Sequence, residues 1–300
     1  MLNGAGLERA LPAIAGLALL GAWTHIWGVS AFVRFAWRHR MTAANYRGEQ
    51  VPTAGGLLLW LLLAGGFAAG RMTLPAADLA RTADFAAAAS LVAGAGLLDD
   101  LIGQRDIKGI GGHLREWRRT SILTTGICKL LAAAGGAFLV LLPQADRHMD
   151  SLLLVPLQAL LIMLSANSVN LLDLRPGRAG KAALLVMTAT AVWYAAAGGA
   201  GPQANALWLS GLWPVMIGAG ILLVPDLRRR LMLGDTGANL LGFAAGVAIT
   251  QTAAIAAQAV ICGLLLLLHL YTARRSLTVF IARHRLLHWL DEMGRPRERA

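Results

Sequence analysis

A set of polar side chains stands inside, or at the ends of, otherwise apolar segments of this chain. Its members are Asp99 and Asp100 in GLLDDLIG, Lys129 in TTGICKLL, Asp235 in LMLGDTGANLLG, and Asn167, Asn170 and Asp173 in SANSVNLLDLRPGRAGK. Carboxylates and ammonium groups at membrane depth are costly unless a partner, an ion or water compensates them. These residues are therefore the first candidates for a functional site.

The chemistry that such a set predicts is the binding of a hard cation or acid–base catalysis. Carboxylates that are brought together repel one another, and a bound cation or altered protonation relieves that repulsion. Oxygen ligands without Cys or paired His favour magnesium, which is typically held by one or two carboxylates while it bridges substrate phosphates. Lys129, about nine residues or roughly 13 Å into its predicted helix, is expected to pair with Asp99 or Asp100.

Simpler interpretations of the same residues remain open. A single aspartate at a helix end is more often a solvated cap than a ligand. The glycines of GDTG fit either close helix packing or a phosphate site at a helix N-terminus. The sequence HRLLH places His284 and His288 four residues apart, which favours an interfacial histidine pair over a metal site.

The elements that must position these residues are predicted to be membrane helices. The chain is 57% hydrophobic and only 14% charged, which is typical of an integral membrane protein. A helix needs about 20 apolar residues to cross the hydrocarbon core. Glycine, proline and polar breaks then predict an all-α polytopic bundle of about nine crossings, within a range of 8–11, at residues 9–33, 51–72, 83–101, 121–142, 151–172, 181–199, 206–225, 234–250 and 253–273.

The basic residues predict the orientation of this bundle. The formal net charge is +11, but Lys and Arg cluster in alternate connections, which is the pattern of the positive-inside rule and not of a nucleic-acid binder. The N-terminus is expected outside and the C-terminus in the cytoplasm. Residues 1–273 form one transmembrane catalytic domain, followed by an amphipathic cytoplasmic tail at 274–300 that lies in the interface. Asp99, Asp100, Asp173 and Asp235 then meet on the cytoplasmic face.

The order and spacing of five motifs resemble the polyprenyl-phosphate N-acetylhexosamine-1-phosphate transferase family over residues 45–245. The motifs are VPTAGGLLL, GLLDDLIG, TTGICKLL, NSVNLLDLRPGR and MLGDTGANLLG. The resemblance implies an enzyme of the bacterial inner membrane that transfers a sugar-1-phosphate from a UDP-sugar, by default UDP-N-acetylglucosamine, to undecaprenyl or another polyprenyl phosphate. UMP is released, magnesium acts at the cytoplasmic face, and a cell-envelope glycan is initiated.

The resemblance also implies roles for individual residues. Catalytic roles fall to Asp99, Asp100, Lys129 and Asp173, and magnesium binding to Asp235, Asp173 and Asn170. Asp99 is the first choice to orient or deprotonate the acceptor phosphate. Substrate binding is expected from residues in three motifs, namely Thr53, Gly55 and Gly56, then Asn167, Asn170, Arg175 and Arg178, and finally Gly234.

One departure from the family pattern marks a divergent subgroup. Gly-Leu-Asp-Gly commonly follows the aspartate of NxxD, but LRPGRAGK stands here, so Pro176 replaces a carboxylate and Arg175 and Arg178 are introduced. These arginines are expected to bind the donor diphosphate. The alternatives are a secondary transporter and a catalytically silent relative that binds lipid-linked intermediates. The expected partners are the acceptor lipid and the donor but no nucleic acid, and a homodimer is left open.

Overall fold

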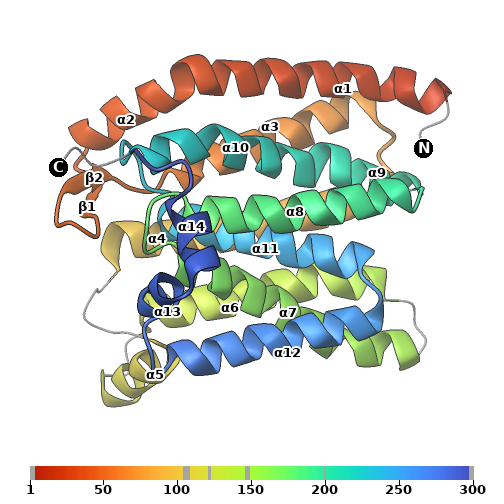
Figure 1. Ribbon diagram of the computed structural model, residues 1–300. Coiled ribbons are helices and arrows are strands. Elements are labelled where there is room, and N and C mark those ends of the chain that lie inside the picture. The colour runs from red at the N-terminus through yellow and green to blue at the C-terminus, as the bar shows by residue number, and fades with distance from the viewer. Residues whose placement is uncertain (1–3, 104–108, 121–122, 146–148, 199–200, 297–300) are drawn as a thin grey trace.

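The computed structural model describes residues 4–103, 109–120, 123–145, 149–198 and 201–296. Long helices lie side by side in it, with the two termini at opposite ends of the bundle (Figure 1). The long helices are α1 (Gly4–Trp23), continued by a π-helical turn (Thr24–Gly28) into α2 (Val29–Arg38), then α3 (Gly56–Thr73), α4 (Ala80–Ile102), α6 (Thr125–Leu141), α7 (Met149–Leu172), α8 (Arg178–Ala196), α11 (Gly234–Thr252) and α12 (Ile255–Thr272). Between α8 and α11, α9 (Pro202–Leu207) continues through a π-helical turn (Trp208–Leu212) into α10 (Trp213–Leu227).

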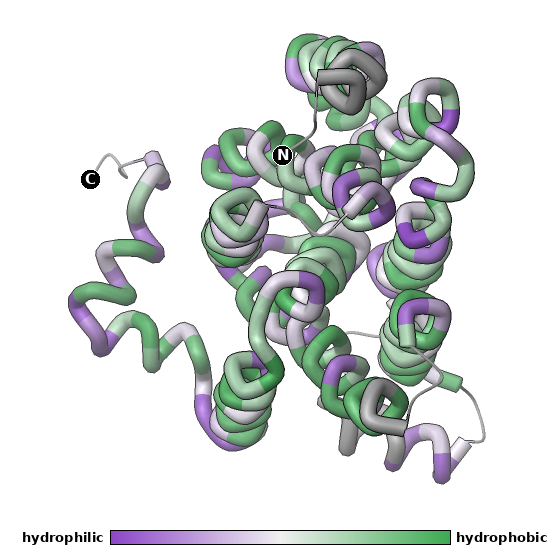
Figure 2. The backbone as a smooth tube through the Cα atoms, turned by 90° about the vertical axis from the view of Figure 1, so that its right-hand side faces the viewer, coloured by the Kyte–Doolittle hydropathy of each residue, from purple (hydrophilic) through white to green (hydrophobic). Residues whose placement is uncertain are grey.

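The prediction of an all-helical membrane bundle is confirmed. Eight helical segments in the described part of the chain are long and apolar enough to cross a membrane. Many of their large apolar side chains face outward, including Leu185, Trp193 and Leu264, each more than half exposed. Figure 2, in which the helices are seen nearly end-on, shows hydrophobic residues on the outer sides of the bundle as well as between its helices. An apolar outer surface suits contact with lipid.

The core of the bundle is α11, which is not among those eight segments. It is buried continuously from Thr236 to Ile249, and it packs mainly against α7, α4, α8 and α3. Small residues allow this close approach: a Cβ at Gly96 of α4 would lie only 2.6 Å from the carbonyl oxygen of Asp235. The predicted helix at 234–250 is therefore present, and its surroundings fix the position of its N-terminus.

Five short elements lie near the end of the bundle at which α11 begins. A hairpin of β1 (Thr42–Ala44) and β2 (Gln50–Pro52) pairs Ala43 with Val51 in antiparallel register. The helix α5 (Gly109–Thr120) follows α4. The predicted tail forms two helices, α13 (Leu277–Arg283) and α14 (Arg285–Glu292), which lie at the side of the bundle at this same end (Figure 1).

Three predicted helix boundaries at this end differ from the structure by four or five residues. The crossing expected to end at residue 33 continues to Arg38. The helix expected from residue 51 begins at Gly56, because Val51 and Pro52 belong to β2. The helix expected from residue 121 begins at Thr125, so Lys129 lies one turn, or roughly 6 Å, along it instead of roughly 13 Å. Lys129 therefore lies near the helix end, at the level of the carboxylates.

The basic segments and the C-terminal tail gather at the end where α11 begins, and the N-terminus lies at the other end (Figure 1). This arrangement fits the alternation seen in the sequence. The assignment of the basic end to the cytoplasm stays a prediction.

Candidate active site

Lys129 and two aspartates form the centre of the candidate site. The Lys129 ammonium of α6 donates to Asp99 Oδ2 of α4 at 2.8 Å and also contacts Asp235 Oδ2 of α11. The three side chains are between 20% and 26% exposed, so they are shielded yet reachable. The predicted partnership of Lys129 with the aspartate pair is present through Asp99, and the structure adds Asp235 to it.

Asp100 has a different environment from its neighbour Asp99. Its Oδ1 accepts from the backbone N–H of Asp235 at 2.9 Å, and its Oδ2 accepts from the N–H and hydroxyl of Thr236 at 2.9 and 2.6 Å. A carboxylate at this position satisfies the free N–H groups of α11 and interacts favourably with the helix dipole. The geometry therefore gives Asp100 the role of a cap contributed by another helix.

Gly234 is required by this cap. Its φ is +69°, and a Cβ there would lie 2.6 Å from both oxygens of Asp100. The backbone N–H of Gly234 also donates to Asp173, at the end of α7. Gly234 thus joins the aspartate of α4 to the aspartate that follows α7.

Asp173 lies among other carboxylates. Burial raises the pKa of Asp173 well above its ordinary value, and the charges of Asp226, Asp235 and Asp100 raise it further. A divalent cation or an added proton would relieve such crowding of carboxylates. The predicted convergence of carboxylates from α4, α7 and α11 at one end of the bundle is confirmed.

Asp226 was not predicted as a site residue. It lies near the end of α10, is only 4% exposed, and accepts a hydrogen bond from the N–H of Gly177 at 2.8 Å. Its sequence context, LLVPDLRRR, merges with the basic segment that follows, so it resembles the start of a loop. The signal that could have revealed it is an aspartate directly after an uninterrupted apolar run.

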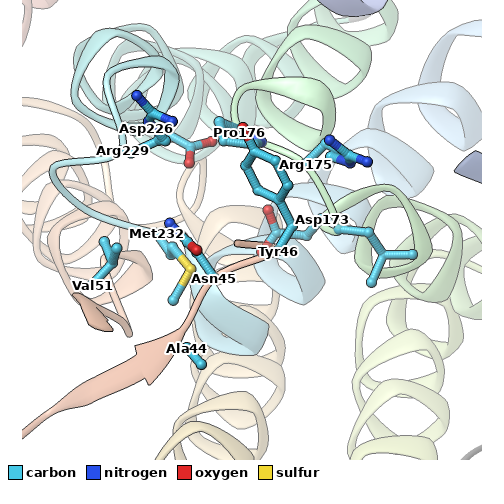
Figure 3. Close-up of a pocket in the computed structure, with 11 residues that line it drawn as sticks. Ala44, Asn45, Tyr46, Val51, Asp173, Arg175, Pro176, Asp226, Arg229 and Met232 are labelled. Atoms are coloured by element: carbon cyan, nitrogen blue, oxygen red, sulfur yellow. The ribbon is translucent and has the colours of Figure 1, made fainter. Parts of the chain in front are cut away.

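A cavity of about 300 Å³ opens beside Asp173 and Asp226. Its wall comes from the β hairpin, the segment after α7 and the segment between α10 and α11, and includes Asn45, Tyr46, Asp173, Arg175, Asp226 and Arg229. The guanidinium of Arg175 lies 4.3 Å from the centre of the Tyr46 ring, which is a cation–π distance. Figure 3 shows Arg175 and Arg229 on opposite sides of this space, with Asp173, Asp226 and the Tyr46 ring between them.

Arg175 lines this cavity, but Arg178 does not. Its side chain is 5% exposed and forms a bidentate ion pair with Asp291 of the tail. Donor binding by Arg175, which lines the cavity, stays a prediction. The same prediction for Arg178 does not fit the structure, because its guanidinium is buried and paired with Asp291.

Three further residues predicted to bind substrate, Gly55, Gly56 and Thr53, lie near the start of α11 and make contacts that hold the fold together. Gly55 and Gly56 donate their backbone N–H groups to the carbonyls of Met232 and Leu233, both at 3.0 Å, which holds the start of α3 beside the start of α11. Thr53 points its hydroxyl toward Asp100 at 3.5 Å. Their role in substrate binding stays a prediction.

Asn167 and Asn170 lie on the last turns of α7, ahead of Asp173. Both are half-buried, and neither side chain makes a hydrogen bond to another residue within the described ranges. Their amide oxygens are thus available, and their assignment to substrate or metal stays a prediction.

The site has the donor chemistry for magnesium but no preassembled cage. Within the described residues, no group of three or more His, Cys, Asp or Glu side chains is arranged to hold a metal ion. Magnesium commonly takes only one or two carboxylates and completes its shell with water and substrate phosphates. Asp235, Asp173 and the amide oxygen of Asn170 are oxygen donors of that kind.

Comparison with known proteins identifies the family. A search among curated proteins found no match. The family model of glycosyl transferase family 4 matches residues 83–253, a range that contains Asp99, Lys129, Asp173 and Asp235. Since this match spans more than half of the chain, the protein belongs to glycosyl transferase family 4.

Proposed function

We propose that this protein transfers a sugar-1-phosphate, by default N-acetylglucosamine-1-phosphate, from a UDP-sugar to a polyprenyl phosphate in a magnesium-dependent reaction. Membership of glycosyl transferase family 4 supports a membrane sugar-phosphate transferase in general. The observation that carries the finer proposal is the cluster in which Lys129 contacts both Asp99 and Asp235. Asp173, which is close enough to feel the charge of Asp235, connects this cluster to a cavity whose wall includes Arg175 and Arg229.

The proposed reaction is a phosphoryl transfer between two anions. An oxygen of the acceptor phosphate forms a bond to the donor phosphorus that carries the sugar. The bond from that phosphorus to the bridging oxygen breaks, and UMP leaves with the electron pair. Because a phosphate monoester has a second pKa near 6, the acceptor is largely ionised at neutral pH, and the site must mainly position and neutralise its substrates.

The residues of the cluster suit this task. Lys129 can exchange a carboxylate contact for a phosphate oxygen, and its charge then stabilises the transferring group. Asp99 lies beside it and can orient the acceptor phosphate. Bound magnesium would supply a Lewis acid that screens the diphosphate, and the proposed ligands are Asp235, Asp173 and Asn170.

The cavity suits the donor. Arg175 and Arg229 lie at its wall, and guanidinium groups bind diphosphates with directed hydrogen bonds. Tyr46 offers an aromatic face at the same place. The position of the cluster at the helix ends would let an acceptor keep its hydrocarbon tail in the bilayer while its phosphate reaches Lys129. We place this face in the cytoplasm of a bacterial inner membrane, where nucleotide sugars are available.

The secondary-transporter alternative expects its polar groups near the bilayer midplane. The described cluster lies instead where α4, α7 and α10 end and α6 and α11 begin, so this observation favours the transferase.

The test is UMP release by the purified full-length protein with magnesium, undecaprenyl phosphate and a panel of UDP-sugars. Release that needs both the lipid and magnesium is expected for one donor. The proposal would be rejected if no donor in the panel gave lipid-dependent UMP while the protein remained folded.

A further inference from the structure

The C-terminal tail is tied to the segment that carries Asp173 and Arg175. This segment is the α7–α8 loop, residues 173–177. Arg178 directly follows it and donates from Nε to Asp291 Oδ1 at 2.8 Å and from Nη2 to Asp291 Oδ2 at 2.7 Å. Both side chains are less than 9% exposed. A bidentate pair of this kind fixes the relative orientation of its two segments.

Arg295 adds a second connection between the tail and the loop. It donates from Nη2 to Asp291 Oδ1 at 2.7 Å and from Nε to the carbonyl oxygen of Pro176 at 3.0 Å. Burial alone would raise the pKa of Asp291, but the hydrogen bonds and charges of Arg178 and Arg295 outweigh it and lower that pKa. Asp291 is thus the shared acceptor between the tail and the start of α8.

Lys181, one turn further along α8, binds the end of α14. Its ammonium donates to the carbonyl oxygens of Leu290 and Asp291, both at 2.7 Å, and of Met293 at 3.0 Å. The last carbonyls of a helix have no partner within it, and a cation at a helix C-terminus is favourable. The basic residues that follow Asp173 in the sequence therefore serve the tail as well as the cavity.

The loop needs this external support because its own bonds are short-range. The backbone N–H of Asp173 bonds to Asn170, that of Leu174 to Leu172, and that of Arg178 to Arg175. The hydrogen bond from Gly177 to Asp226 holds one side of the loop. The tail holds the other side, through Pro176 and Arg178.

The tail also extends the cavity outward. A second cavity of about 630 Å³ shares Tyr46, Arg175, Pro176 and Arg229 with the first. The tail contributes Trp289, Met293 and Arg295 to its wall. Displacement of the tail would therefore open this space and release the loop at the same time.

We infer that Asp291 is a positioning residue for the transferase: through Arg178 and Arg295 it holds the α7–α8 loop so that Asp173 and Arg175 face the donor. This inference rests on the proposed function. It assigns a role to the C-terminal tail and to Arg178, one of the two arginines that mark the departure from the family pattern after Asp173.

The experiment compares Asp291→Asn with a matched control, Glu116→Gln, in the full-length protein. Glu116 also forms a bidentate pair with an arginine, Arg119, but on α5 and away from the loop. For Asp291→Asn we expect a donor KM about tenfold higher, with the acceptor KM changed by less than about twofold, since the loop carries the donor contacts. The control should leave both constants unchanged.

Amide hydrogen exchange gives a readout that needs no turnover. Asp291→Asn should speed exchange in the α7–α8 loop by about tenfold while α4 and α11 stay protected. Lys181→Met, which keeps Asp291 but releases the end of α14, should shift exchange in the same direction. This measurement separates the two proposals, because it decides the positioning role even if no donor is turned over.

Three results would overturn the inference. The first is unchanged exchange in the α7–α8 loop in both variants. The second is faster loop exchange with an unchanged donor KM in an active enzyme. The third is faster exchange spread through α4 and α11, since that would make Asp291 a general stabilising residue.

Discussion

The two ends of the central helix α11 are tied to their neighbours by different chemistry. At its N-terminus, Asp235 meets Lys129, and Asp100 caps the first turn. At its C-terminus, Gln251 donates to Gln144 at 3.0 Å. A second amide pair near that end joins Gln158 to Gln258 at 3.1 Å.

Neutral amide pairs join helices at little desolvation cost, whereas clustered charges are expensive to bury. The far end of the bundle therefore shows that neutral hydrogen bonds are enough to join these helices. The charged side chains at the near end are unfavourable to bury, so their presence there indicates that they serve a function.

The largest difference between the two ends is expected when a charge at the N-terminal end of α11 is removed. Asp235→Asn should lower the rate of UMP release by about 10³-fold, since it removes a proposed magnesium ligand and a partner of Lys129. Gln251→Leu on the same helix, about 24 Å away, should change that rate by less than about twofold. Steady-state assays on both variants measure the contrast, and similar losses in the two would contradict it.

Lys129→Met should produce the next largest effect. The rate should fall by about 10²-fold because a positive charge at the transferring phosphate is lost. Two shielded carboxylates also lose their cation, so the free energy of unfolding should fall by about 1–3 kcal/mol. Thermal unfolding in detergent checks the second effect. A variant as stable as the parent would show that the ion pairs contribute nothing to the fold.

Arg175→Gln should raise the donor KM by about tenfold, because its guanidinium lies at the cavity and a charged hydrogen bond is lost. The acceptor KM should stay within about twofold. Initial rates at varied donor and lipid concentrations separate the two constants. Equal rises in both would place Arg175 outside the donor site.

The neighbouring residues Asp100 and Asp99 should respond differently to substitution, Asp100 in stability and Asp99 in rate. Asp100→Ala should cost about 1–2 kcal/mol of stability as a lost helix cap. Asp100→Asn should cost less, because its amide oxygen replaces one of the two acceptor oxygens that α11 uses. Asp99→Asn should instead lower the rate, by at least about tenfold more than Asp100→Asn does. The role of Asp100 as a cap would be refuted if its Asn variant lost activity as completely as Asp99→Asn.

The smallest effect is expected at the far end. Loss of the Gln158–Gln258 pair in Gln158→Leu should cost about 0.6 kcal/mol, the usual value for a hydrogen bond between membrane helices. Activity should be unchanged. Thermal unfolding and UMP release together test this, and a large loss of activity would mean that the two ends are coupled through the bundle.

Much of this molecule could be predicted from local pattern. Uninterrupted apolar runs predicted the helices because membrane length and backbone hydrogen bonding leave few alternatives. Misplaced polar residues predicted Asp99, Lys129, Asp173 and Asp235, since a charge in an apolar run is conspicuous. Asp226 was missed because the basic residues after it conceal the end of its helix.

The helical class, the alternation of basic segments and the gathering of carboxylates at one end all follow from the residue pattern. That pattern could not distinguish Asp99 from Asp100, or Arg175 from Arg178, because each pair is alike in type and close in the chain. Helix packing gives Asp99 to Lys129 and makes Asp100 the cap of α11, and the position of the tail leaves Arg175 at the cavity while Arg178 binds Asp291. The reason is physical: the partners of a side chain come from segments that are distant in sequence, and those contacts exist only once the helices have packed.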